Sequence, residues 1–181
     1  MVLKETLISP DLIQEAIDLF TRVRNVPFRL GLDHNPDKLF KEGVGHCDRK
    51  HLYLLPRLQH LGYRVDIGIA IFDWRQLPIP DTIISLLKDP IQKHMFLFAN
   101  DQAVDATWPP GMTGFTTNSW DGINATPLGV EAIKIFKPNP AILHARILAG
   151  DLRDLITSTL PRPTPFNDAF NSWLEKQQQN S

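Results

Sequence analysis

Apolar residues recur at two periods along this chain, every three or four positions in some stretches and every second position in others. Residues 10–23 have apolar residues at every third or fourth position, which predicts a helix. The letters SPD at residues 9–11 are typical of a helix N-terminus. Residues 24–46 are rich in Pro, Gly and Asn, which predicts a loop with a single helical turn at 36–41.

A second helix is predicted to begin at Cys47. Its leucines keep helical spacing as far as Leu61, and Gly62 is a favoured residue just past a helix end. Pro56 lies inside this segment, where it removes one backbone hydrogen bond and should bend the helix.

Period-two patterns predict an antiparallel sheet. One strand covers residues 65–71, a hairpin covers 93–108 with its turn at 99–102, and residues 131–136 add another strand. The connection 75–92 has room for one or two helical turns, and residues 109–129 predict a loop.

Two further helices are predicted near the C-terminus, at 140–158 and 166–178. With helices first, a sheet in the middle and helices last, we expect a single α+β domain over residues 1–181, of which 139–181 is a helical extension. A chain of 181 residues is long enough for one hydrophobic core and short for two.

Charge and composition exclude several classes of function. The formal net charge is −1, so we expect no broad attraction to nucleic acid or to an anionic membrane. No apolar run approaches the about 20 residues of a membrane-spanning helix. The first residues lack a basic start followed by an apolar block, so we expect no secretory signal. One cysteine cannot form an internal disulfide, and we expect a cytoplasmic protein.

The single cysteine, Cys47, has two competing interpretations. A lone cysteine is commonly a small buried apolar residue. A thiol at a helix N-terminus can instead be a nucleophile, because the free N–H groups and the helix dipole lower a thiol pKa that is otherwise about 8.5, as does a nearby imidazolium. Gly43 and Gly45 allow the tight loop that leads into such a position.

The predicted hairpin supplies a candidate base and a group to orient it. With a two-residue turn at Ala99-Asn100 or at Asn100-Asp101, His94 and Asp105 share one face as direct or diagonal neighbours. Their Cβ atoms would then be roughly 5–8 Å apart. A register slip of one residue would place them on opposite faces.

The order Cys, His, Asp resembles the transglutaminase-like branch of the papain-like cysteine-enzyme superfamily. The resemblance covers residues 20–108. Its motifs are the lead-in segments RNVPFRL and NPDKLFKEGVGHC, the letters GHC that open a helix ending in LG, the strand entry YRV, and the later HMF and DAT. Each motif alone is common, and it is their order that points to the family.

This resemblance implies a papain-like core, in which the nucleophile helix and other N-terminal helices pack on an antiparallel sheet and helices follow at the C-terminus. It implies a triad of Cys47 as nucleophile, His94 as base and then acid, and Asp105 as the group that fixes the imidazole tautomer. The backbone N–H of Cys47 is one expected oxyanion donor. Asn35, with His34 beside it, is the candidate for the second.

Three features depart from the family pattern. The family has a small residue four positions after the cysteine, where this chain has His51. Pro56 interrupts a helix that is normally continuous, and the hairpin between His94 and Asp105 is short. These departures bear on the substrate class more than on the triad.

Other residues allow other interpretations. Cys47 and His51 have the i, i+4 spacing of a metal-binding pair, but further ligands are not evident, so we expect no metal and no cofactor. Phe115 and Trp120, together with His51, are candidates for a wall of the substrate site. Basic residues around the nucleophile are expected on a solvated face: Lys38, Lys41, Arg49 and Lys50.

The expected activity is acyl transfer through a thioester on Cys47, from an amide or ester carbonyl. Water is favoured as the acceptor, which makes a hydrolase or peptidase, over an amine, which makes a transamidase. The expected partner is a peptide, a protein or a small amide, with no nucleic acid and no membrane. The alternative is a non-catalytic binding or scaffold module on the same fold, and the dependence of thiol reactivity on His94 separates the two.

Overall fold

The computed structural model describes residues 8–139 and 164–179, so the helix predicted at 140–158 lies outside the described residues. The N-terminal half holds three helices: α1 (Pro10–Arg24), α2 (Lys38–Glu42) and α3 (Cys47–His60). The sheet strands are β1 (Val65–Asp73), β2 (Ile91–Ala99), β3 (Gln102–Val104) and β4 (Ala132–Phe136). A 3-10 turn (Trp74–Gln76) and α4 (Asp81–Ile84) connect β1 to β2, and α7 (Pro165–Gln179) lies near the C-terminus.

The helix ends follow the signals in the sequence. The side chain of Ser9 accepts a hydrogen bond from the N–H of Leu12 and caps α1. Gly62 follows α3 with a φ of 92°, a conformation that glycine adopts without strain. The boundaries of α1, α3 and α7 agree with prediction to within two residues.

The four strands form one antiparallel sheet in the order β3-β2-β1-β4. In the hairpin, Ala99 pairs with Gln102, so the turn is Asn100-Asp101, the second of the two predicted alternatives. Both turn residues have positive φ, which matches the twist of the flanking strands. Of the two predicted registers, the one with the turn at Asn100-Asp101 is the one observed, and it keeps His94 and Asp105 on one face.

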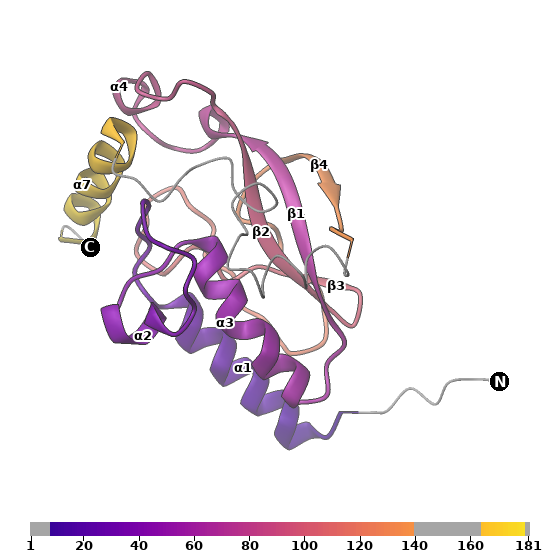
Figure 1. The fold of residues 1–181 in the computed structure, drawn as a ribbon. Helices are drawn as coiled ribbons and strands as arrows, with labels where there is room; N and C mark the ends of the chain where they lie inside the picture. Colours follow the sequence, from indigo (N-terminus) through magenta and orange to yellow (C-terminus); the bar gives the residue numbers. More distant parts are fainter. Residues whose placement is uncertain (1–7, 140–163, 180–181) are drawn as a thin grey trace.

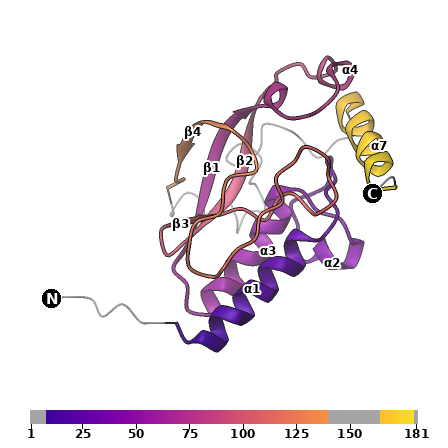
Figure 2. The same cartoon turned by 180° about the vertical axis from the view of Figure 1, so that it is seen from behind.

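The sheet has a buried face on each side. α1 and α3 lie side by side on one face (Figures 1 and 2), where they cover Ile67 and Leu97. On the other face, Phe72 and Phe96 belong to a second apolar cluster, to which α7 contributes three side chains: Phe166, Phe170 and Leu174. The α+β class and the packing of the Cys47 helix on an antiparallel sheet are confirmed. Within the described ranges, no helix is both long and apolar enough to cross a bilayer.

Candidate active site

Cys47 is the first residue of α3, where a tight loop enters the helix. His46 is the N-cap residue, and its Nδ1 accepts a long hydrogen bond, 3.5 Å, from the N–H of Arg49. Gly45 is needed just before it, because a Cβ there would collide with the side chain of Leu39. The thiol is thus held at the mouth of the helix, where free N–H groups favour an anion.

The first turn of α3 lies where β2 and β3 separate. The ladder ends with β3, and in its register the next hydrogen-bonded pair would be Met95 and Ala106. The Ala106 N–H instead donates to Nε2 of His51 at 3.0 Å. The Met95 N–H points at the sulfur of Cys47. This arrangement brings the thiol to the cavity that His94 also lines.

His94 and Asp105 are in direct contact, as their shared hairpin face predicted. Nε2 of His94 lies 2.7 Å from Oδ2 of Asp105. The N–H groups of Thr107 and Gly129 also donate to this carboxylate, at 3.0 and 2.7 Å. Burial opposes ionisation of Asp105, but His94, His51 and the hydrogen bond from Thr107 together outweigh it and hold the pKa of Asp105 below its ordinary value. Since Asp105 occupies Nε2, Nδ1 is the nitrogen left for proton exchange with a thiol.

The thiol itself is neutral at rest. Cys47 is half-buried, and its Sγ donates to Oδ1 of Asp48 at 3.2 Å rather than to His94. Burial, together with the negative charge of Asp48, raises the pKa of Cys47 well above its ordinary value, and the Met95 N–H opposes this only in part. Attack by this thiol therefore needs a base to take its proton.

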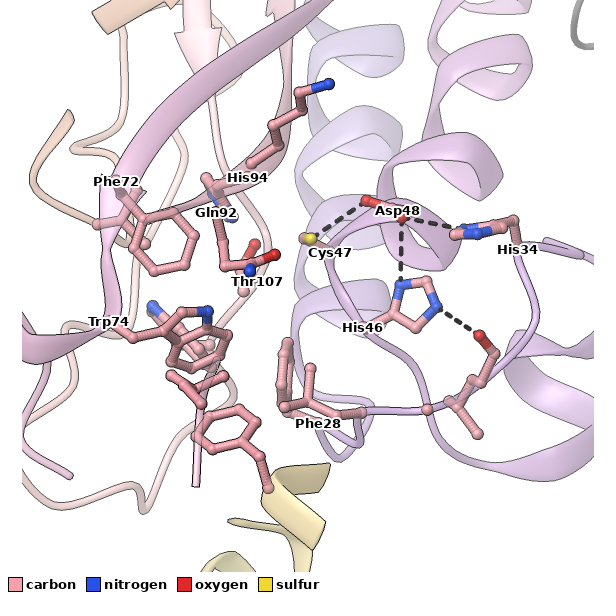
Figure 3. A pocket seen from close by; sticks show the side chains of 18 residues that line it. Phe28, His34, His46, Cys47, Asp48, Phe72, Trp74, Gln92, His94 and Thr107 are labelled. Atoms are coloured by element: carbon pink, nitrogen blue, oxygen red, sulfur yellow. Dashed lines mark hydrogen bonds and ion pairs between the residues drawn. The ribbon is translucent and has the colours of Figure 1, made fainter. Parts of the chain in front are cut away.

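Cys47 and His94 line one cavity with a free volume of about 70 Å³ (Figure 3). This space holds several water molecules or a small acyl group. One part of its wall is aromatic: Phe28, Phe72, Trp74, Trp108 and Phe166. The part beside the thiol is polar: His34, His46, Asp48, Gln92 and Thr107.

The prediction that His51 forms a wall of the substrate site is wrong. His51 is fully buried and does not line the cavity. Its Nδ1 lies 2.8 Å from the carbonyl oxygen of Cys47, and its Nε2 accepts the Ala106 N–H. Burial lowers the pKa of His51 to about 4, so the ring is a neutral link between α3 and the hairpin. With both nitrogens in use, it cannot join Cys47 in a metal site.

The prediction that Asn35 supplies the second oxyanion donor is also wrong. Asn35 is exposed, does not line the cavity, and accepts the N–H of Asp37 at 3.0 Å through its side-chain oxygen, as a turn residue does. His34, its neighbour, does line the cavity. The backbone N–H of Cys47 lies in the first turn of α3, whose donors have no partner within the helix.

Phe115 and Trp120 lie behind the site rather than in its wall. Trp120 is buried between α1 and the following loops, with its ring 5.7 Å from that of Phe20. Phe115 packs on Trp108 with ring centroids 4.6 Å apart, and it is Trp108 that lines the cavity. The pairing of β1 with β2 places Phe72 opposite Gln92, on the same face of the sheet as His94.

The prediction that Arg49 and Lys50 lie on a solvated face is wrong, since both residues are fully buried. Arg49 forms ion pairs with Asp33 at 2.8 Å and with Glu42 at 2.7 Å. Lys50 donates to two backbone carbonyls, one of them of Thr107 at 2.8 Å, and burial lowers its pKa to about 7. Both side chains tie α3 to the segments that surround the thiol.

Within the described residues, one group has the donor atoms and spacing to hold a metal ion: His34, His46 and Asp48. No family model, no curated protein and no solved structure matches this chain. The resemblance to transglutaminase-like enzymes therefore stays a prediction from the motifs.

Proposed function

We propose that this protein is a thiol-dependent acyl-transfer enzyme in which Cys47 is the nucleophile, His94 the base and Asp105 the residue that orients His94. The observation that carries the proposal is the 2.7 Å contact between His94 and Asp105, at a cavity that the Cys47 thiol also lines. If His94 and Asp105 had only a structural role, there would be no need for a thiol at the N-terminus of a helix that opens onto the same cavity. The α3 helix on an antiparallel sheet supports a transglutaminase-like core for the fold.

The reaction begins with the neutral thiol, whose side chain turns from Asp48 towards His94. Nδ1 of His94 takes the thiol proton as the sulfur attacks the carbonyl carbon of an amide or ester. N–H groups of the first turn of α3, including that of Cys47, stabilise the oxyanion. The imidazolium then protonates the leaving amine or alcohol, and a thioester remains.

Water completes the reaction. His94 takes a proton from the water as its oxygen attacks the thioester, and the acid product leaves as the thiol is restored. Asp105 holds Nε2 throughout, so the imidazole keeps the tautomer that the reaction needs. Within the described residues, Asp48 is the one carboxylate in the cavity wall, and two imidazoles face it, which leaves little attraction for a cationic amine acceptor. Hydrolysis is therefore favoured over transamidation.

The aromatic part of the wall indicates the substrate class. It offers apolar contact to the acyl group and excludes water from it. The substrate we propose is an amide or ester, in a peptide or a small molecule, with a small apolar acyl side.

A scaffold role on the same fold is the second candidate. The observation that favours it is the thiol's bond to Asp48, which with burial keeps the thiol neutral. In that case the sulfur would be no more reactive than a free thiol, and His94 would not affect it.

The test is acylation by p-nitrophenyl butyrate in the presence of a chelator, followed by intact-protein mass spectrometry. We expect a single butyryl adduct on Cys47, absent in Cys47→Ala, and release of nitrophenol that His94→Ala slows by at least about 100-fold. His60→Ala, at the exposed end of α3, is the matched control and should behave as the parent protein. The rate at which iodoacetamide alkylates Cys47 is a second, independent measurement. If nitrophenol release and alkylation are both as fast in His94→Ala as in the parent protein, the proposal is wrong and the scaffold role is favoured.

A further inference from the structure

Two imidazoles and a carboxylate converge beside the thiol, on atoms that the acyl-transfer chemistry does not use. His34 comes from the loop before α2, His46 caps α3, and Asp48 lies in the first turn of α3 (Figure 3). Oδ2 of Asp48 is 3.0 Å from Nδ1 of His34 and 3.8 Å from Nδ1 of His46. Donor atoms of all three residues lie within 4.8 Å of one another.

The carboxylate oxygen at the centre of this group has close contacts with the two imidazoles but no well-directed hydrogen bond. Asp48 is fully buried, and its Oδ2 has no partner with hydrogen-bond geometry; neither has Nδ1 or Nε2 of His34. The other oxygen, Oδ1, is the one that accepts from Cys47. A buried charged oxygen with only imidazole contacts and no well-directed donor is less well stabilised than a fully hydrogen-bonded one. A site that collects three such atoms around one point is suited to a bound cation.

The tautomer of His46 also fits a ligand role. Its Nε2 lies 3.3 Å from the carbonyl oxygen of Leu32, to which it donates, so the lone pair is on Nδ1, the atom that faces Asp48. Metal-binding histidines in general donate their second nitrogen to a carbonyl or carboxylate in this way. The Arg49 N–H also reaches Nδ1, but at 3.5 Å, so this bond is weak.

We propose that His34 Nδ1, His46 Nδ1 and Asp48 Oδ2 bind a divalent transition metal ion, Zn²⁺ by preference. Two imidazole nitrogens and one carboxylate oxygen are a donor set that Zn²⁺ accepts, with a fourth position left for water. Tetrahedral zinc with bonds of about 2.1 Å places its ligands about 3.4 Å apart. The two observed distances to Asp48 lie on either side of that value, and all three donor atoms lie within 4.8 Å of one another, so side-chain rotations that draw the two imidazoles closer together complete the site. All three residues line the cavity, which leaves the fourth position accessible.

An ion pair between His34 and Asp48 without any metal is the competing explanation of the same contacts. It predicts that zinc has no more affinity for this group than for any exposed histidine. The two explanations are separated by direct binding, with no need for enzymatic activity.

The experiment uses tag-free, chelator-stripped full-length protein titrated with ZnCl₂ by calorimetry. We expect one equivalent bound with micromolar or tighter affinity, and a loss of about 100-fold or more in each of His34→Ala and Asp48→Asn. His60→Ala is the matched control and should bind as the parent does. Cys47→Ala should also bind zinc normally, so a failure of the acyl-transfer proposal leaves this result unaffected. Far-UV circular dichroism checks that the variants are folded, and Asp48→Asn keeps the shape of the buried side chain.

Cobalt(II) gives an independent reading of the ligand set. The absorption spectrum of the cobalt(II)-loaded protein should show the visible bands of a four- or five-coordinate site. It should lack a sulfur-to-cobalt charge-transfer band. Absence of stoichiometric zinc binding overturns the proposal. So does binding that survives both ligand variants, and so does a charge-transfer band that Cys47→Ala removes.

Discussion

His51 joins α3, the helix that begins at Cys47, to the hairpin through a neutral imidazole. One nitrogen lies 2.8 Å from the Cys47 carbonyl oxygen, and the other accepts the Ala106 N–H at 3.0 Å. Asp105 and His94 face the ring from the hairpin, and Lys50 lies beside it on its own helix. Burial outweighs the attraction of Asp105 and lowers the pKa of His51 to about 4.

The pKa of His51 makes the stability of the fold sensitive to pH. The unfolded chain takes up a proton on this residue near pH ~6.5, whereas the folded chain does so only near pH 4. Stability should therefore be complete above pH ~6.5 and fall by about 3 kcal/mol as the pH drops to 4. Urea unfolding between pH 4.5 and 7.5 measures this slope.

The variant His51→Gln isolates the contribution of His51, because burial lowers the pKa of His46 as well. A glutamine amide can replace one of the two hydrogen bonds but does not titrate. We expect a loss of about 1–2 kcal/mol at pH 7.5 and a clearly flatter slope below pH 6.5. His60→Gln, exposed on the same helix, should keep the parent slope. An unchanged slope in His51→Gln would show that His51 is not the titrating group.

Arg49, Lys50 and His51 also mark what the sequence does not reveal about single residues. Three consecutive polar residues look like a solvated stretch, and a helical pattern does predict that one of them faces inward. All three are buried here, because each has partners from other segments, such as Asp33 for Arg49 and Thr107 for Lys50. Such partners are chosen by the tertiary fold and leave no mark in the local pattern.

The helix α3 runs from Cys47 to His60 in spite of Pro56 in its interior. Proline cannot donate to the carbonyl of Leu52, one turn back. One residue later, the side chain of Arg57 donates to the carbonyl of Tyr53 at 2.9 Å, which supplies a further bond in this irregular stretch. Pro56 is exposed, so packing does not compensate for the missing bond.

We expect Pro56→Ala to stabilise the protein by about 2 kcal/mol. Alanine is favoured over proline in a helix interior by about 3 kcal/mol, and the greater freedom of the unfolded alanine chain takes back about 0.5–1 kcal/mol. Urea unfolding at pH 7.5 measures the change.

Pro10→Ala is the matched control, because Pro10 is the first residue of α1, where its missing N–H has no intrahelical partner to lose. This variant should be neutral or slightly destabilising. If Pro56→Ala is destabilising too, the proline is contributing to the tertiary structure rather than weakening the helix.

The hairpin is the element whose local pattern carried the most information. Alternation of apolar residues set which side chains share a face, and a two-residue turn set the register, so the contact of His94 with Asp105 followed from the sequence. The docking of α3 at the end of this hairpin did not follow. It depends on β3 ending early and on Ala106 donating to His51 instead of to β2. Both are properties of the assembled fold.

The C-terminal helix α7 completes the cavity from more than a hundred residues away in the chain. Phe166 and Phe170 pack on Trp74 with ring centroids 5.2 and 5.5 Å away. Asn171 exchanges two hydrogen bonds with the backbone of Leu30, at 2.9 and 3.1 Å, and so ties α7 to the loop between α1 and α2. Figures 1 and 2 show α7 beside α4.

No local signal predicts this closure. The helical period of residues 166–178 was evident in the sequence and α7 has those bounds to within one residue, but a period states only that one side of a helix is buried. Which surface it covers depends on complementarity between distant segments. This is why Cys47, His94 and Asp105 could be proposed as a triad from the sequence, whereas Phe166 could not be placed in the cavity wall.

Two phenylalanines of α7 allow the role of this closure in substrate choice to be tested. Phe166 lines the cavity, whereas Phe170 is buried in the same helix without being part of the wall. Replacing either with alanine removes a buried ring and should cost about 3–5 kcal/mol of stability. Only Phe166→Ala adds space for the acyl group.

We therefore expect Phe166→Ala to favour longer acyl chains. If two further methylenes enter the vacated space, the ratio of kcat/KM for p-nitrophenyl octanoate to that for the butyrate should rise about 15-fold, at about 0.8 kcal/mol for each methylene. Phe170→Ala should lose comparable stability and keep the parent ratio, measured at a temperature where both variants are folded. Equal shifts in the two variants would mean that loosening of α7, and not the shape of the wall, sets the preference. Two unchanged ratios would mean that the acyl group binds elsewhere.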